Sequence, residues 1–324
     1  MGIQEMLQPS AVEGVTSLVQ CGREITPAEI ALIVELREMY PTLSYSGFVG
    51  TVCEVLGWLV ASGEPKTEAC TKLLEKLEAA GIVTLPPKES RKVPYKRKRS
   101  TRPLWGPQTE PADPVEGELS EIGPIRVEPA TKKASICLWN EYADRYHKLG
   151  YKKPFGCRMR YFIESDHGKL GCLLIAGGAK SIGVRDRWIG WSDQVRLQNL
   201  GWVANNSRFV IFPWVKVRNL ASHALGQVVR RMSDDWQRKW SFRPLLVETF
   251  VDPEHYRGSC YRGAGWQLLG STTGEGLVRP GKTYSTNPKL IFVKPVPPFS
   301  VDDARQLLCR KELVAWTEQL RARI

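Results

Sequence analysis

Three consecutive residues near the C-terminus carry side chains that could do chemistry: Cys260, Tyr261 and Arg262. Ser259 is a suitable N-cap, which would place the Cys260 thiol in the first turn of a helix. The helix dipole and nearby arginines favour a thiolate, so we expect a lowered pKa for Cys260 and attack on phosphorus or carbonyl carbon. The Tyr261 phenol could instead attack DNA or serve as a general acid. Adjacent helical positions diverge by about 100°, so only one of the two can face a given site, and an inert buried cysteine is the alternative.

A glutamate in the middle of an apolar run is the second candidate. Residues 245–252 predict a strand in which Glu248 and Asp252 share one face. They lie roughly 13 Å apart along the strand, too far to hold one metal ion together. Glu248 could act as a base, or bind Mg²⁺ with Asp186 brought in by the fold, so both are candidate catalytic and metal-binding residues. A buried Glu–Arg pair is the structural alternative.

The positive charge is concentrated in the C-terminal part of the chain. Residues 1–85 contain 5 Lys and Arg against 11 Glu, a net charge of −6, and residues 86–131 contain 9 basic and 7 acidic residues, a net charge of +2. Because the whole chain carries +12, residues 132–324 carry a net charge of +16. Such a balance predicts a polyanion, single- or double-stranded DNA, as the partner, while a merely soluble basic protein is the alternative. Arg262 and Arg187 would neutralise a phosphate. The candidate nucleic-acid-binding residues are Lys72, Lys96, Arg97, Lys98, Arg99, Arg185, Arg187, Arg208, Lys216 and Arg218.

Three predicted helices open the chain. A capping box at Thr26 and Glu29 starts a helix that ends near Tyr40, and apolar spacing predicts further helices over 46–60 and 66–80. A short strand is expected at 82–85. This outline indicates a winged helix-turn-helix domain over 1–87, in which DNA binding and protein docking compete because the domain is acidic. Residues 88–131 are expected to be a linker, first basic and then acidic.

Residues 132–324 predict an α/β (α+β) domain on a mixed sheet. Helices are expected at 139–149, 219–240, 259–265 and 304–323, and strands at 159–165, 170–176, 209–215, 244–251 and 290–293.

The chain resembles two known families. The segments RFVIFPWVKVRNLASHAL, LLVETFVD and GSCYRGAGWQLLGSTTG resemble the central strand, turn, next strand and tyrosine-bearing helix of the acetyltransferase-like (GNAT) fold. That family's phosphate-cradling turn is glycine-rich, and Lys216, Asn219 and Ala221 at the matching positions argue against acetyl-CoA. The closer resemblance is to the DruA-like family of Druantia anti-phage systems and transposase-associated proteins. It rests on WNE at 139–141, RDRWIGW at 185–191, NNSRF at 205–209, NLAS at 219–222, ETFVD at 248–252 and GSCYR at 258–262.

The DruA-like resemblance implies DNA transactions in defence or transposition. We therefore expect an enzyme that cleaves or transfers DNA strands at Cys260 or Tyr261, together with other defence or transposition proteins as partners. An acyl or aminoacyl transferase and a non-catalytic DNA-binding adaptor are the alternatives.

The composition of the sequence argues against several classes of protein. No apolar run approaches the roughly 20 residues of a membrane helix, and the N-terminus lacks a secretory pattern, so a cytoplasmic protein without membrane contact is expected. The eight cysteines form no CxxC pair, which argues against a disulfide framework or a zinc site.

Overall fold

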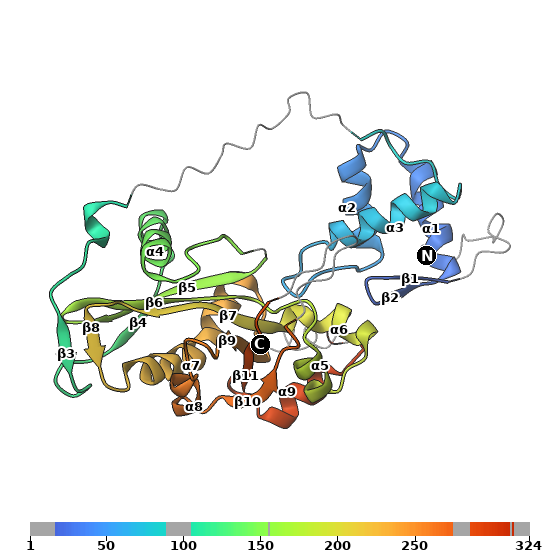
Figure 1. Ribbon diagram of the computed structural model, residues 1–324. Coiled ribbons are helices and arrows are strands. Elements are labelled where there is room, and N and C mark those ends of the chain that lie inside the picture. Colours follow the sequence, from blue (N-terminus) through green and yellow to red (C-terminus); the bar gives the residue numbers. More distant parts are fainter. Residues whose placement is uncertain (1–16, 89–104, 155, 275–285, 312, 314–324) are drawn as a thin grey trace. The chain divides into compact units, whose positions relative to one another are not determined.

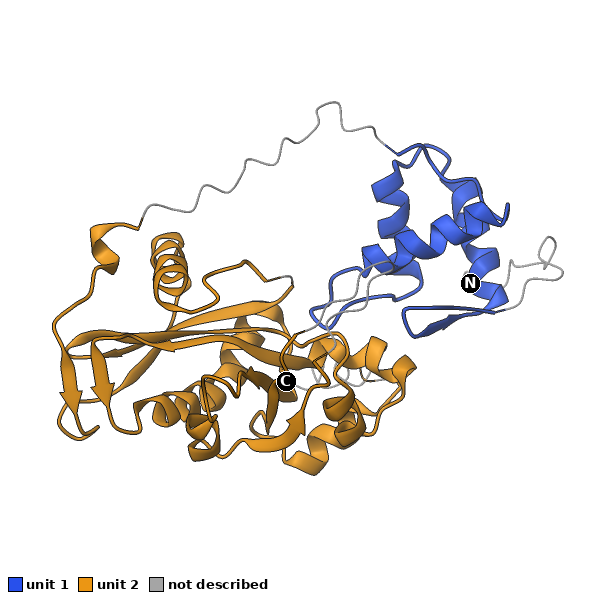
Figure 2. Ribbon diagram, viewed as in Figure 1, with its two compact units in different colours: residues 1–96, 314–318 blue, residues 97–313, 319–324 orange. Residues whose placement is uncertain are grey.

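The computed structural model describes residues 17–88, 105–154, 156–274, 286–311 and 313. These residues fall into two compact units, shown in Figure 2. The described residues up to Lys88 belong to the first unit, and those from Trp105 onward belong to the second. The basic stretch with Lys96, Arg97, Lys98 and Arg99 lies outside the described residues.

The first unit begins with a hairpin that the sequence did not predict. Strands β1 (Leu18–Gln20) and β2 (Arg23–Ile25) pair antiparallel through a turn at Cys21 and Gly22, whose φ angles are 50° and 82°. Helix α1 (Pro27–Met39) follows directly. Its N-terminus has the expected capping box, in which Glu29 N donates to the Thr26 hydroxyl and Thr26 N donates to the Glu29 carboxylate.

Helices α2 (Tyr45–Val55) and α3 (Thr67–Ala79) complete this unit around an apolar core that includes Ile33, Phe48 and Leu73. The strand expected at 82–85 is wrong, because those residues form no strand. Their backbone is held by side chains instead: Leu85 N donates to Glu78 Oε1 over 3.1 Å, and Arg37 Nε donates to Thr84 O over 2.9 Å. The winged-helix assignment is therefore not confirmed and stays a prediction.

The second unit is built on a seven-stranded mixed sheet, as the sequence predicts (Figure 1). Its order is β10-β11-β9-β7-β6-β5-β4. The strands are β4 (Arg126–Pro129), β5 (Arg158–Ser165), β6 (Gly168–Gly177), β7 (Val203–Ile211), β9 (Leu246–Val251), β10 (Gln267–Ser271) and β11 (Leu290–Pro295). All neighbours pair antiparallel except β7 and β9, which are parallel.

The parallel pair separates partway along its length. β7 and β9 pair from Val203 opposite Leu246 to Asn206 opposite Thr249, after which β7 continues beside β6 only. The expected strand at 209–215 is thus displaced: β7 starts at Val203, and the short β8 (Val215–Val217) leaves the sheet to pair with β3 (Val115–Gly117). The residues of β7 beyond Asn206 consequently border a split in the sheet.

Helices cover both faces of this sheet (Figure 1). α4 (Lys133–Tyr146) lies on one face and donates a hydrogen bond from Trp139 Nε1 to Tyr161 O. α7 (Leu220–Trp240) and α8 (Ser259–Gly263) lie on the other. Two short helices that the sequence did not predict, α5 (Gly183–Ile189) and α6 (Asp193–Asn199), lie near α9 (Val301–Leu308). The helix expected at 304–323 starts at Val301, and residues 312 and 314–324 lie outside the described part.

Candidate functional site

Glu248 is the most deeply buried acidic residue among the candidates. Its side chain is fully buried on β9, where Oε2 accepts from Arg185 Nη1 at 2.8 Å and Oε1 accepts from Ala179 N at 2.6 Å. Burial raises the pKa of Glu248, and the charge of Arg185 opposes that rise. The structural alternative of a buried Glu–Arg pair is therefore confirmed.

Asp186 belongs to the same network through Arg185. Its Oδ1 accepts from Arg185 Nη2 at 2.7 Å and from Trp191 Nε1 at 3.0 Å, and its Oδ2 accepts from Ile182 N at 3.0 Å. Arg185 itself is fully buried between the two carboxylates. A guanidinium thus stands where a shared metal ion would have to lie, so the arrangement suits an ion-pair network better than Mg²⁺. The catalytic and metal-binding roles of both carboxylates stay predictions.

Tyr261 on α8 is buried against residues of β7, β9 and β11. Its hydroxyl lies 3.3 Å from Thr249 Oγ1, and its ring stacks on Phe292 and meets Trp266 edge-on, with centroids 5.6 and 5.1 Å away. On the β7 side the Tyr261 ring meets Phe209 edge-on, with centroids 6.4 Å apart, so aromatic side chains surround it. Burial raises the pKa of Tyr261 well above its usual value, so the phenolate needed for attack is disfavoured.

Cys260 is in a different environment from the one expected. The N-cap of α8 is Gly258, with φ 69°, and not Ser259. Burial raises the pKa of the Cys260 thiol, which overturns the expected lowering, because the loss of hydration outweighs the hydrogen bonds from backbone N–H groups. The thiol is consequently protonated at neutral pH, and its nucleophilic role stays a prediction.

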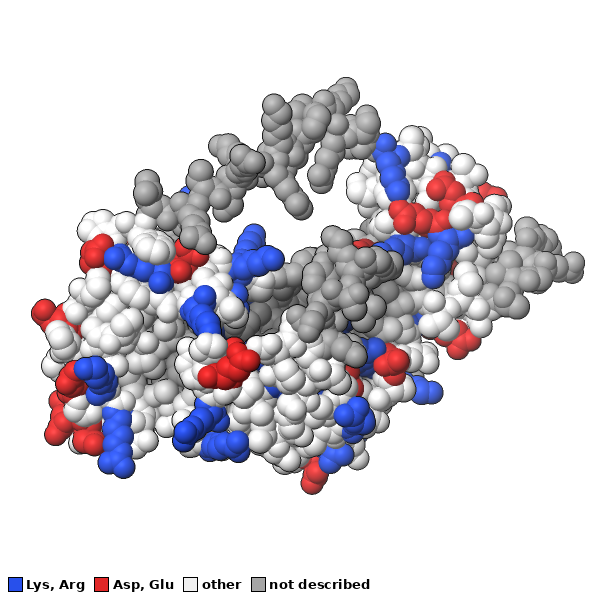
Figure 3. Space-filling model, in the orientation of Figure 1, with Lys and Arg blue, Asp and Glu red and all other residues white. Residues whose placement is uncertain are grey.

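The expected nucleic-acid-binding residues have unequal access to solvent. Lys72, Lys216 and Arg218 are exposed but lie beside Glu68, Glu116 and Glu118 at 3.4, 2.8 and 3.8 Å. Arg208 donates to the carbonyls of Gly150 and Ser207, and Arg185 is buried. Figure 3 shows many such blue and red neighbours on the face it displays. Arg187 is exposed and forms no ion pair with any described residue.

A group of cations lies around α8, of which the sequence indicated Arg257 and Arg262 as the arginines near Cys260 but not Arg230 or Lys294. Arg257 and Arg262 are exposed, as is Arg230 on α7, and none has an acidic partner within the described ranges. Arg262 lies over the Phe292 ring at 5.3 Å. Lys294 donates to Ala264 O at 2.5 Å, and its pKa is lowered by burial and by the charge of Arg230. We call Arg230, Arg257, Arg262 and Lys294 the α8 cation group. Arg230 on α7 and Lys294 on β11 are brought to α8 by long-range packing, which no local pattern shows.

A mixed cluster follows β9. Asp252, Glu254 and His255 place their ligand atoms within 4.8 Å of one another. Lys289 Nζ is 3.0 Å from Asp252 Oδ2, and Lys148 Nζ is 2.5 Å from His255 Nε2. Ammonium groups therefore occupy the positions where a metal ion would compete, and the cluster is an exposed charge network.

None of the helices in the described residues is both long enough and apolar enough to cross a membrane.

Comparison with solved structures finds distant similarity to acetyltransferases. A chimeric spermidine N-acetyltransferase SpeG from Vibrio cholerae and hSSAT shares 8% identity over 53% of this chain and 95% of its own, with a TM-score of 0.36. An N-acetyltransferase from Staphylococcus aureus Mu50 shares 7% identity over 54% of this chain and 99% of its own, with a TM-score of 0.31. Scores this low support no argument about ligand or activity.

Sequence comparison gives the family. No functionally curated protein matches the chain. The family model described as Druantia protein DruA matches residues 76–285, well over half of the chain. The chain therefore belongs to the DruA family.

Proposed function

We propose that this protein is a nucleic-acid-binding adaptor of a Druantia-type defence system, which holds DNA by its phosphates and does not cut it. The observation that carries the proposal is the α8 cation group. Arg230, Arg257 and Arg262 are exposed and have no acidic partner among the described residues, in a part of the chain with a net charge of +16. Unpaired arginines of this kind bind phosphodiesters and release condensed counterions.

The state of the candidate catalytic groups supports the part of the proposal that excludes cleavage. The Tyr261 hydroxyl and Cys260 thiol both have raised pKa values, and Glu248 is engaged by Arg185 and Ala179 N. A nuclease needs an activated nucleophile or a metal held by free carboxylates. The described residues supply cations for binding more readily than groups for hydrolysis.

The first unit supports a protein-docking role in this proposal, whether or not it is a winged helix. Lys72 on α3 pairs with Glu68, and Lys88 pairs with Glu75 of α3, so Lys76, which donates to Gln20, is the one exposed lysine of α3 without an acidic partner among the described residues. Met39 and Tyr40 at the end of α1 are 54% and 49% exposed. An acidic surface with exposed apolar residues suits a protein partner better than a phosphate backbone.

The test uses the full-length protein with labelled single- and double-stranded oligonucleotides, with and without Mg²⁺. We expect retention on a native gel that weakens with salt, and neither nicks nor a covalent adduct on a denaturing gel. Replacing two members of the α8 cation group, Arg230→Gln with Arg262→Gln, should lower the affinity by about three- to tenfold and reduce the salt slope by about 2.

The matched control is Arg126→Gln with Arg243→Gln, which removes the same charge from arginines already paired with Asp166 and Asp234. Its affinity should stay closer to that of the unaltered protein. Failure of the unaltered protein to bind either oligonucleotide would overturn the proposal. Nicking or an adduct that disappears in Cys260→Ser or Tyr261→Phe would replace it with strand processing.

A further inference from the structure

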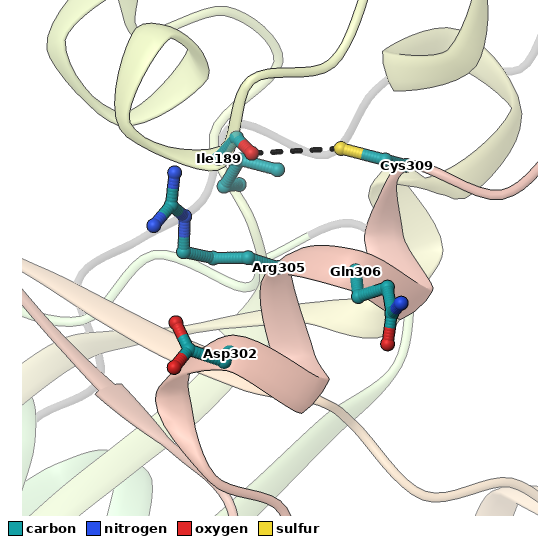
Figure 4. Close-up of a pocket in the computed structure, with 5 residues that line it drawn as sticks. All are labelled: Ile189, Asp302, Arg305, Gln306 and Cys309. Carbon is teal, nitrogen blue, oxygen red and sulfur yellow. Dashed lines mark hydrogen bonds between the residues drawn. The ribbon is translucent and has the colours of Figure 1, made fainter.

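A groove of about 400 Å³ lies between α5 and α9 (Figure 4). It is lined by Ile189 at the end of α5 and by Asp302, Arg305, Gln306 and Cys309. Its size is within the range of small-ligand sites. The Cys309 thiol is already engaged, because it donates to Ile189 O over 3.5 Å. The groove is therefore defined chemically by its charged and amide side chains.

Arg305 is the unusual member of this lining. Its guanidinium lies over the Trp188 ring, 5.4 Å from the centroid, and forms no hydrogen bond or ion pair with any described residue. The Nε atom is buried and lacks an acceptor. Stacking on tryptophan uses the flat face of a guanidinium and leaves its in-plane N–H donors available. The terminal Nη groups also form no hydrogen bond with any described residue, so a ligand in the groove that supplies acceptor oxygens would satisfy donors that the protein leaves free.

Asp302 limits what that ligand can be. It lies three residues before Arg305 on the same helix, yet the two form no ion pair. Figure 4 shows both side chains extending from the same side of α9 with a gap between their charged ends, while Gln306 points away. An oxyanion on Arg305 would be attracted by the guanidinium and repelled by the Asp302 carboxylate. Removing the carboxylate should consequently strengthen binding.

We propose that the groove between α5 and α9 is a phosphate-binding subsite in which Arg305, oriented by Trp188, holds the oxygens of one phosphate group. Planar guanidinium donors match the oxygens of a phosphate in a bidentate manner. This inference rests on the proposed function for the source of the phosphate, which is the backbone of a bound nucleic-acid strand. Free inorganic phosphate offers the same chemistry, and the test separates the two sources.

The experiment compares Arg305→Met and Asp302→Asn in the full-length protein. Methionine keeps apolar volume over Trp188 and removes the charge and the donors. We expect Arg305→Met to weaken binding of a labelled single-stranded oligonucleotide by about five- to tenfold and to lower the salt slope by about 0.7. Asp302→Asn should tighten binding about two- to threefold, a gain that a misfolded variant cannot produce. Arg126→Met, which removes an arginine paired with Asp166, is the control and should change little.

A second arm measures the melting temperature with inorganic phosphate at matched ionic strength. If phosphate stabilises the unaltered protein but not Arg305→Met, and no oligonucleotide binds, the subsite stands with free phosphate as its ligand and the proposed nucleic-acid function fails. If oligonucleotides bind but Arg305→Met and Asp302→Asn behave like the unaltered protein, the subsite is refuted and the proposed function stands. Equal stabilisation of both proteins by phosphate also refutes the subsite.

Discussion

Arg185 connects more of the candidate residues than any other side chain. It donates to Glu248 Oε2 and Ala179 O at 2.8 Å and to Asp186 Oδ1, and its guanidinium lies 5.6 Å from the Trp191 ring centroid. All of its polar contacts are internal, and its side chain is fully buried. The RDRWIGW motif is thus explained at Arg185, Asp186 and Trp191 by a structural network that fixes α5 against β9.

This network predicts an asymmetric response to mutation. Arg185→Met should lower the free energy of unfolding by about 3–5 kcal/mol, because Glu248 would remain buried without its cation. The double variant Arg185→Met with Glu248→Met should cost less than the sum of the two single changes, since it removes both members of the buried pair, whereas each single change leaves the other charge without its partner. Urea unfolding, monitored by tryptophan fluorescence, measures the free energy of unfolding of the two single variants and of the double variant.

Arg187→Met is the matched control on the same helix. Arg187 is exposed and has no ion pair within the described residues, so its replacement should change stability by no more than about 0.5 kcal/mol. If Arg185→Met lowered the free energy of unfolding as little as Arg187→Met, the Arg185–Glu248 pair would not be buried in solution.

At the scale of elements, sequence patterns identified what is determined locally. The capping box of α1, the hairpin of β5 and β6, and the buried strands β9 and β11 were predicted because a cap, a tight turn or an apolar run signals each of them. Helices α5 and α6 contain only seven residues each, too few for helical periodicity to be seen. The partner of Glu248 could not be identified either, because Arg185 is 63 residues away and is brought to β9 by tertiary packing.

The helix α8 depends on a backbone conformation that only glycine adopts readily. Gly258 has φ 69°, and a Cβ placed there would lie 2.7 Å from two ring carbons of Phe292. Gly258→Ala should therefore reduce the free energy of unfolding by about 1–3 kcal/mol, through backbone strain and displacement of the ring beneath Arg262. Thermal unfolding measures the loss.

Gly226→Ala is the control for this change. Gly226 lies within α7, and a Cβ there would meet only the flexible end of Arg230, at 3.5 Å. Alanine in a helix interior should stabilise by about 0.5–1 kcal/mol. Equal effects of the two substitutions would contradict the strained turn at Gly258.

At the scale of the whole molecule, the two units carry opposite charge. Residues 1–85 have 5 basic and 11 acidic residues, whereas residues 132–324 have a net charge of +16. Like charges repel over distances set by ionic strength, so the acidic part should weaken the attraction of the basic part for a polyanion. A DNA-reading winged helix at the N-terminus would have the opposite effect, because it would add contacts.

Removing residues 1–85 distinguishes these possibilities. If the first unit docks protein, the shortened chain should bind a non-specific DNA duplex several-fold more tightly at about 50 mM salt, with the difference fading near 0.5 M as screening shortens the reach of the charges. The affinity of the full-length protein with Glu24→Gln, Glu38→Gln and Glu54→Gln for the duplex should also rise, by a smaller amount. These exposed glutamates have no ion pair among the described residues, so their replacement removes negative charge without breaking a pair. Weaker binding by the shortened chain at every salt concentration, with its cooperative unfolding intact, would instead assign DNA contacts to the first unit.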